Sequence, residues 1–209
     1  MIQLTILRHG ETDWNAIGRI QGQQQVPLNQ RGMAQAQAAA EYLRNEQFDA
    51  IYSSDLIRAL HSARPFSKIF GLPIIEEPAL REWNLGILEG LLCTDAATLH
   101  PQANQIYRGR QPDALIPQAE TIRQRYNRAI QCIEQIASQH SNQHLLIVTH
   151  GGILDDWYRH VNEIPLETER NWPLNNAGIS RFTRQAEKWQ TTHWSEIQHL
   201  ESIGSMADW

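Results

Sequence analysis

Cysteine is scarce in this sequence, and its scarcity restricts both the type of fold and the compartment. Cys93 and Cys132 are the only two cysteines among 209 residues, too few for the disulfide framework that stabilises small secreted domains. Cys132 lies in an apolar helical stretch and is predicted to be a core residue. A reducing compartment is therefore expected, and a cytoplasmic location is the simplest prediction.

Long apolar runs are missing as well. No stretch approaches the roughly 20 apolar residues of a membrane-spanning helix. The apolar run at residues 2–7 is not preceded by the basic segment of a signal peptide. The chain also lacks internal repeats, low-complexity tracts and linker-like segments. We therefore expect no membrane association and a single domain that covers residues 1–209.

The sequence has no excess of positive charge. Lysine and arginine number 18 against 23 aspartates and glutamates, for a formal net charge of -5 at pH 7. This balance disfavours nucleic acids and anionic membranes as main partners, because both attract basic surfaces. A small anionic substrate remains compatible, since a few arginines can gather locally on an acidic protein. The glycine-rich turn of dinucleotide-binding proteins is absent too, because Gly10 stands alone after the first predicted strand.

What the sequence does contain is an alternation of predicted strands and helices. Predicted strands cover residues 2–8, 48–53, 72–75 and 144–149, followed by two late strands at 177–183 and 189–194 with a hairpin turn at 185–187. Predicted helices cover residues 30–43 with Asn29 as N-cap, 56–70 with a kink or break at Pro65 and an end at Gly71, 121–138, and a segment from Gly151 onward. Several strands are apolar throughout. The pattern predicts an α/β fold, a three-layer α/β/α sandwich with a mostly parallel central sheet.

One segment, at about residues 95–119, departs from this alternation. Pro101, Pro112 and Pro117 interrupt it, and irregular or short helical structure is expected. Insertions beside a sheet often form a lid or a wall of the substrate site, which is the role predicted for this one. Its basic residues, Arg108 and Arg110, could bind a substrate carboxylate or a second phosphate, or could simply be solvated.

Two predicted strands end in the same short pattern, a histidine followed by glycine. The first ends in Arg8-His9-Gly10, and the strand at 144–149 is followed by His150 and two glycines. Ligands of open α/β sheets bind beyond the carboxyl ends of the strands. Arginine offers phosphate a planar fork of donors, histidine is nucleophilic near neutral pH, and a helix amino terminus attracts anions. The two histidines are therefore expected to meet at a phosphate site.

Arg58 and Glu82 are the remaining catalytic candidates. A helix capped by Ser54 or Asp55 would carry Arg58 in its first turn, within reach of the same edge of the sheet. Glu82 stands beside Trp83, an aromatic setting that suits a general acid. Alone, Arg58 could be a solvated surface residue and Glu82 an ordinary salt-bridged one. Together with the two histidines, they favour a catalytic site.

In their order along the chain, these motifs resemble the histidine phosphatase superfamily, which includes the cofactor-dependent phosphoglycerate mutases. The resemblance rests on residues 7–12 with Asn15, 18–22, 27–32, 53–59, 80–82 with Gly86, 148–152, 176–180 and 199–200. It spans most of the chain and implies a phosphoglycerate mutase-like fold.

The resemblance also implies a role for each candidate. His9 would attack phosphorus and become phosphohistidine, while Arg8, Arg58 and His150 would hold the phosphoryl oxygens. Glu82 would protonate the leaving oxygen and then accept a proton from water. The residues implied to line the phosphate pocket are Gly10, Asn15, Gln21, Gly22 and Gly151. Because guanidinium groups can neutralise phosphate charge, neither a metal nor another cofactor is expected, and the partner is a small phosphorylated metabolite.

Three other functions compete with a phosphatase. A mutase is disfavoured because larger mutase relatives carry a longer, base-rich insertion than the segment at 95–119. A non-catalytic phospho-ligand binding protein on the same fold is disfavoured because all five catalytic candidates are retained. A metal site at His140 and His144, four residues apart, lacks the cysteine or carboxylate cluster that would support it.

The natural substrate and the oligomeric state stay open. The chain departs from many relatives at residues 23–25, which are all glutamine, and at residues 118–121, where Gln-Ala-Glu-Thr replaces a common Gly-Glu-Ser. Both segments lie near substrate-contacting or helix-capping positions. Some of the seven tryptophans could support a dimer edge, so a homodimer is neither required nor excluded.

Overall fold

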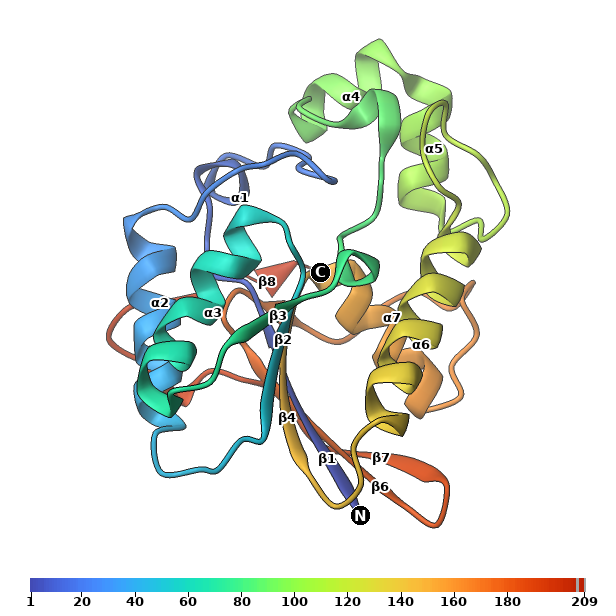
Figure 1. Cartoon of the computed structure of the whole chain (residues 1–209). Coiled ribbons are helices and arrows are strands. Elements are labelled where there is room, and N and C mark those ends of the chain that lie inside the picture. The colour runs from blue at the N-terminus through green and yellow to red at the C-terminus, as the bar shows by residue number, and fades with distance from the viewer. Residues whose placement is uncertain (206, 209) are drawn as a thin grey trace.

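A computed structural model describes residues 1–205 and 207–208 (Figure 1). The strands are β1 (Ile2–Arg8), β2 (Ala50–Ser53), β3 (Ile74–Glu76), β4 (His144–Thr149), β5 (Leu174–Asn175), β6 (Ile179–Gln185), β7 (Lys188–Glu196) and β8 (Ala207–Asp208). The α-helices are α1 (Asp13–Ala16), α2 (Gln30–Tyr42), α3 (Ile57–Phe70), α4 (Cys93–Leu99), α5 (Pro101–Gly109), α6 (Ile122–Ser138) and α7 (Gly151–Val161). Short 3₁₀ turns occupy Pro78–Leu80, Gly86–Leu88 and Gln198–Leu200.

The central sheet has six strands in the order β3-β2-β4-β1-β6-β7. The first four are parallel, and β6 and β7 continue the sheet in antiparallel fashion. Helices α2 and α3 cover one face of the sheet and α6 and α7 cover the other (Figure 1). The prediction of an α/β/α sandwich with a mostly parallel central sheet is therefore confirmed.

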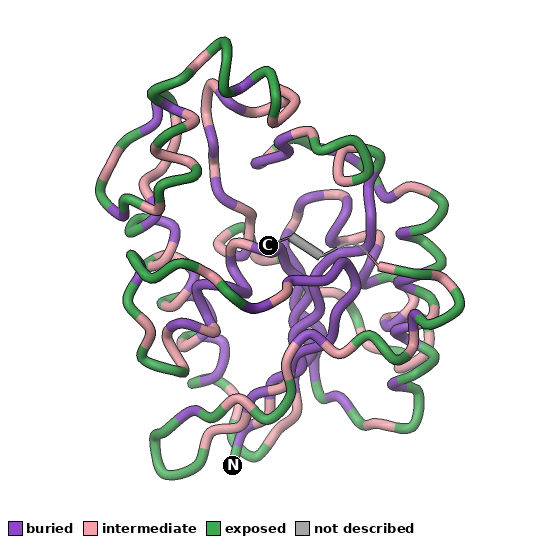
Figure 2. Tube along the Cα trace, turned by 180° about the vertical axis from the view of Figure 1, so that it is seen from behind, coloured by how far each residue is buried: buried purple, intermediate pink, exposed green. Residues whose placement is uncertain are grey.

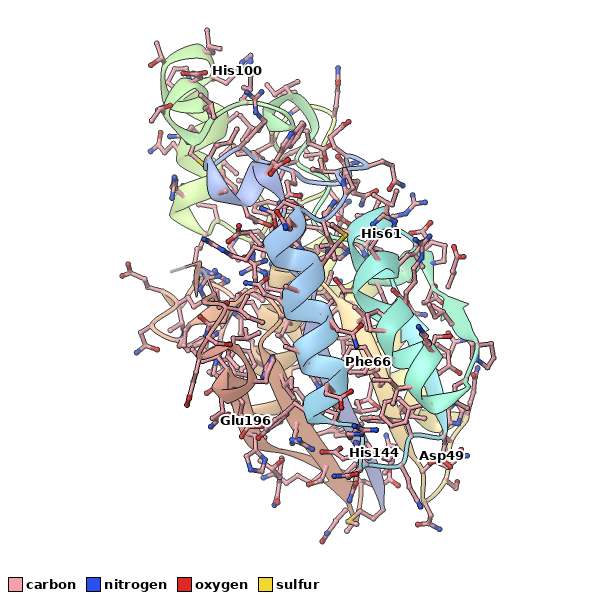
Figure 3. All side chains as sticks on the ribbon, turned by 90° about the vertical axis from the view of Figure 1, so that its left-hand side faces the viewer. Asp49, His61, Phe66, His100, His144 and Glu196 are labelled. Carbon is pink, nitrogen blue, oxygen red and sulfur yellow. The ribbon has the colours of Figure 1, made fainter. Side chains whose placement is uncertain are left out.

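The alternation of side chains along the central strands explains why the sheet supports two cores. Leu145 and Ile147 of β4 belong to the apolar cluster shared with α6 and α7, whereas Leu146 and Val148 belong to the cluster shared with α2 and α3. Successive side chains of a strand point to opposite faces, so an uninterrupted apolar strand packs on both. Figure 2 shows the resulting buried centre, and Phe66 of α3, labelled in Figure 3, is fully buried within it.

Several local signals in the sequence form as expected. The Asn29 side chain caps α2 by accepting a hydrogen bond from Gly32 N, and Gly71 ends α3 in the left-handed conformation with a φ of 67°. The hairpin between β6 and β7 turns at Ala186 and Glu187, both with positive φ. A two-residue turn with positive φ at both positions matches the right-handed twist of the flanking strands.

The start of α3 differs from the prediction, and the helix has no break at Pro65. Its N-cap is Leu56, not Ser54 or Asp55, because both of those side chains are engaged elsewhere. Ser54 Oγ lies 2.8 Å from His150 Nε2, and the Asp55 carboxylate pairs with Arg81. The helix also continues through Pro65, since the packing of buried residues on either side of the proline outweighs the lost hydrogen bond.

The segment at 95–119 contains the short helices α4 and α5 and then irregular chain, as expected. Helices α4 and α5 lie beyond the carboxyl ends of the central strands, at the top of Figure 1. They pack on a third apolar cluster, which includes Trp83, Leu88, Ala96 and Ala103. Within the described part of the chain, no helix combines the length and the apolar character required to cross a bilayer.

Gly10 and Gly32 allow the loop after β1 to lie directly against the first turn of α2. A Cβ on Gly10 would lie 2.4 Å from Gly32 O, and a Cβ on Gly32 would lie 2.0 Å from Glu11 O. Both obstacles are backbone atoms, which cannot rotate away. This close approach fixes the position of the loop that follows His9.

We expect Gly32→Ala to destabilise the protein by about 1–3 kcal/mol, the usual cost of overpacking. The matched control is Gly109→Ala in α5, where the nearest obstacle to a new Cβ is the Gln111 side chain at 3.7 Å. Urea unfolding of both variants measures the difference. Equal stabilities for the two variants would contradict the importance of this contact.

Candidate active site

The register of the central strands brings the ends of β2, β4 and β1 together. Arg8 pairs with Thr149 in the β1–β4 ladder, so the next residue of each strand is a histidine. Ser53 pairs with Val148 in the β2–β4 ladder, which puts Ser54 on the other side of β4. The ring centroids of His9 and His150 lie 5.2 Å apart, with planes inclined at 59°. The structure therefore brings the two predicted histidines into direct contact.

The hydrogen bonds of His9 identify the ring nitrogen that holds its lone pair. His9 Nδ1 lies 2.7 Å from the carbonyl oxygen of Gly10. A carbonyl oxygen can only accept, so Nδ1 must carry the hydrogen, and in the neutral ring Nε2 then holds the lone pair. The backbone of His9 is fixed as well, because its N–H donates to Thr149 O at 2.9 Å and its carbonyl accepts from Asn176 Nδ2 at 3.1 Å.

His150 is fully buried at the amino terminus of α7, where it is the N-cap residue. Its Nε2 lies 2.8 Å from the hydroxyl oxygen of Ser54. Its Nδ1 has no hydrogen-bond partner among the described residues. This nitrogen is therefore the one that remains for a ligand.

Arg8 and Arg58 are the buried cations of the site. The Arg58 guanidinium donates from Nη1 to Gln24 O at 2.8 Å and from Nη2 to Gly22 O at 2.7 Å, while its Nε is unpartnered within the described residues. Burial, together with the nearby charge of Arg8, lowers the pKa of Arg58 to about 10, so it stays protonated at neutral pH. Arg8 donates from Nη1 to the carbonyl of Leu174. Both side chains thus hold positive charge in a region with little water.

Glu82 lies against the amino terminus of α7. Its Oε1 accepts a hydrogen bond from Trp83 N at 2.8 Å, and its Oε2 accepts one from Gly152 N at 3.0 Å. A Cβ on Gly152 would lie 2.2 Å from Glu82 Oε1, so only glycine leaves room for the carboxylate there. The helix amino terminus stabilises negative charge at this position.

Burial and neighbouring charge keep both imidazoles neutral. Burial is the largest cause that lowers the pKa of His9 well below 6.5, and Arg58 and Arg8 lower it further. The pKa of His150 is lowered well below 6.5 by burial, then by Arg58 and His9. A neutral imidazole has a lone pair for attack, which a protonated one lacks.

The five residues predicted to line the phosphate pocket have different surroundings. Gly10 donates its N–H to Ser62 Oγ at 3.0 Å, and Gly22 supplies a carbonyl to Arg58. Asn15 closes the capping box of α1 with Thr12. Gln21 has a buried Oε1 without a partner in the described part of the chain, and Gly151 is the buried first residue of α7. Gly10 and Gly22 therefore shape the loops around the site, with backbone groups that already form hydrogen bonds.

Arg128 is a residue that the sequence analysis did not single out. From α6 it donates to the carbonyls of Ala79 at 2.7 Å and Arg81 at 2.9 Å, and its Nη2 lies 3.4 Å from Glu82 O. It also pairs with Glu120 at 2.5 Å. Arg128 thereby holds the backbone that carries Glu82, through contacts that join residues 46 to 49 positions apart and leave no local signal.

The two basic residues of the insertion separate into different roles. The Arg110 side chain is held by two hydrogen bonds, because its Nη2 donates to Asp155 Oδ2 at 3.0 Å and its Nε donates to Leu166 O at 3.2 Å. Arg108 is exposed and lies over the ring of Tyr107 at 5.5 Å. Arg110 therefore connects the insertion to α7 of the core.

The histidines considered for a metal site are engaged in other contacts. His140 Nε2 lies 2.9 Å from Tyr52 Oη, and His144 Nε2 lies 2.8 Å from Thr5 Oγ1. Among the residues that the structure describes, no group of three histidine, cysteine or acidic side chains is arranged to hold a metal ion.

The lowered pKa of His9 can be followed by NMR titration of its imidazole. We expect a midpoint well below 6.5 in the wild type and a higher midpoint in Arg58→Met, because loss of the cation makes protonation easier. Arg58→Lys, which keeps the charge, is the control. An unchanged midpoint in Arg58→Met would contradict the assigned electrostatics.

Comparisons with known proteins place the chain in a family. The family model described as "Histidine phosphatase superfamily (branch 1)" matches residues 4–197. The chain is 38% identical to the metal-independent phosphoserine phosphatase of Arabidopsis thaliana, over 97% of this chain and 84% of the relative. It is 33% identical to the probable phosphoglycerate mutase GpmB of Proteus mirabilis, over 97% of both chains.

Among solved structures, the phosphoserine phosphatase of Entamoeba histolytica in complex with 3-phosphoglyceric acid is similar with a TM-score of 0.85 and 26% identity. The match covers 96% of this chain and 100% of that one. The family model and the relatives span nearly the whole chain, including every element that carries the site. The chain belongs to branch 1 of the histidine phosphatase superfamily.

Proposed function

We propose that this protein is a metal-independent phosphatase that hydrolyses a small phosphomonoester through a phosphohistidine intermediate on His9. The observation that carries the proposal is the pair of buried, neutral imidazoles 5.2 Å apart, in the field of Arg8 and Arg58. His9 presents a lone pair on Nε2, and His150 has Nδ1 available for a further hydrogen bond. Such a pair is suited to attack on a phosphoryl group and to stabilisation of its oxygens.

In the first step His9 Nε2 attacks phosphorus, and the bond between phosphorus and the ester oxygen breaks. Glu82 gives its proton to the leaving oxygen, so the product departs as a neutral alcohol. Arg8, Arg58 and His150 stabilise the charge on the three oxygens of the transferring group. Phosphoryl transfer depends mainly on positioning and on this neutralisation.

In the second step water attacks the phosphohistidine. Glu82, now a carboxylate, takes a proton from the water as the phosphorus–nitrogen bond breaks. Inorganic phosphate leaves, and His9 returns to its neutral form with the hydrogen on Nδ1. Glu82 can accept this proton because its hydrogen bonds to Trp83 N and Gly152 N occupy only part of the acceptor capacity of a carboxylate.

Phosphoserine and related small carboxylated phosphomonoesters are the first substrates we propose. The support is the relatives' own names, a phosphoserine phosphatase at 38% identity and a phosphoserine phosphatase structure that contains 3-phosphoglyceric acid. We propose that α4 and α5 form a wall of the substrate site, since they lie beyond the carboxyl ends of the strands (Figure 1). A cytoplasmic setting is part of this proposal, in keeping with the two free cysteines.

A phosphoglycerate mutase is the second candidate, favoured by the relative named as a probable mutase. A mutase must return the phosphoryl group from His9 to a second hydroxyl before water reaches it. The two functions therefore differ in the acceptor of the second step, and not in the attack by His9.

The test is phosphate release from phosphoserine, 3-phosphoglycerate and a sugar phosphate in the presence of EDTA, with wild type beside His9→Ala. We expect release that survives EDTA and falls at least 10³-fold in the variant, on the scale of the loss of a catalytic nucleophile. Formation of 2-phosphoglycerate without phosphate release would favour the mutase. Near-normal turnover by His9→Ala, or loss of activity in EDTA, would overturn the proposal.

A further inference from the structure

Ser54 has a contact that the sequence did not indicate. Its side chain is fully buried, and its hydroxyl lies 2.8 Å from His150 Nε2 and accepts a hydrogen bond from Leu56 N at 3.3 Å. The oxygen therefore has one lone pair engaged and one hydrogen to place. The placement of that hydrogen determines which nitrogen of His150 is protonated.

Two arrangements of the hydrogens are possible, and they satisfy different numbers of groups. If His150 Nε2 carries the hydrogen and donates to Ser54, the Ser54 hydroxyl hydrogen has no acceptor and the lone pair on Nδ1 has no donor among the described residues. If Ser54 donates to Nε2, both the hydroxyl and Nε2 are satisfied. Only the hydrogen on Nδ1 then awaits a partner. Unsatisfied buried polar groups are costly, so the second arrangement is favoured.

We propose that Ser54 is a positioning residue that holds His150 in the tautomer with its hydrogen on Nδ1, so that this nitrogen donates to an oxygen of the transferring phosphoryl group. The donation from His150 Nδ1 to a phosphoryl oxygen rests on the proposed function. The tautomer of His150 does not. Ser54 acts through His150 and does not itself contact the reacting atoms.

The two histidines then have opposite tautomers, each set by one neighbouring oxygen. The carbonyl of Gly10 can only accept, which leaves a lone pair on His9 Nε2 for attack. The hydroxyl of Ser54 can donate, which leaves an N–H on His150 Nδ1 for binding. Because the lowered pKa of each ring keeps it neutral, these neighbours decide what each ring can do. In the other tautomer, the lone pair on His150 Nδ1 would face the phosphoryl oxygens and repel them.

The experiment is ¹⁵N NMR of the imidazole nitrogens in the substrate-free protein, with Ser54→Ala compared with the wild type. We expect a pyrrole-type Nδ1 and a pyridine-type Nε2 for His150 in the wild type, and a gain of the opposite form in Ser54→Ala. Ser53→Ala is the matched control, because Ser53 is equally buried and its hydroxyl donates to Ser54 O at 2.9 Å. It should leave the tautomer of His150 unchanged.

The wild-type spectrum alone can overturn the inference, whether or not Ser54→Ala folds. A pyridine-type Nδ1 in His150 would do so, and so would an unchanged tautomer in a folded Ser54→Ala. Addition of inorganic phosphate should shift the Nδ1–H proton signal of the wild type, and the absence of any shift at saturating phosphate would contradict the assigned donor. None of these spectra depends on turnover, so failure of this inference is distinguishable from failure of the proposed function.

A single-turnover assay measures the consequence for chemistry. We expect phosphorylation of His9 to slow about 10-fold to 100-fold in Ser54→Ala, somewhat less than the loss of a direct donor. Ser54→Thr retains a hydroxyl and should recover part of the rate together with the wild-type tautomer. Loss of rate in Ser54→Ala and Ser53→Ala alike would indicate a structural role and contradict the inference.

Discussion

The parallel pairing of β1 with β4 is the constraint on which the candidate site depends. It places His9 and His150 at adjacent strand ends, and a slip of one residue would turn one set of side chains to the other face. Because residues 145–148 of β4 are apolar on both faces, burial of that strand alone does not select the register. Polar contacts at the opposite end of the strands do, since Thr5 Oγ1 lies 2.8 Å from His144 Nε2 and Gln3 N donates to Gln143 O at 3.0 Å.

Once the strand ends are in place, the site concentrates positive charge inside an acidic protein. The chain has a net charge of -5, yet two arginines with exposures of 2% and 0% lie beside the histidines. Burial is the main reason that the imidazoles are neutral, and the charge of the two arginines lowers the pKa of both rings further. Arg58 Nε and His150 Nδ1 have no partner within the described residues, and phosphoryl oxygens would supply acceptors to both. One arrangement therefore favours both the neutral imidazoles and the anionic substrate that we propose.

The sequence was sufficient for the six strands of the central sheet and for the long helices, because these depend on periodicity and on short local patterns. It failed where distant residues compete for one group. Ser54 and Asp55 are good N-caps by residue type, but His150 and Arg81 engage them, and Leu56 takes the cap position. Arg128 and the pairing of Arg110 with Asp155 were missed for the same reason, since their partners are distant in the chain. The tautomers of the histidines depend on single oxygens and could be read only from the folded chain.

The most direct test of the account is to identify the atom of His9 that carries phosphorus. Rapid quenching of the protein with a phosphomonoester, followed by peptide mass spectrometry and phosphorus NMR, distinguishes the two isomers of phosphohistidine. Because Nδ1 donates to Gly10 O, we predict phosphorus on Nε2 of His9. Phosphorus on Nδ1, or on a residue other than His9, would contradict it.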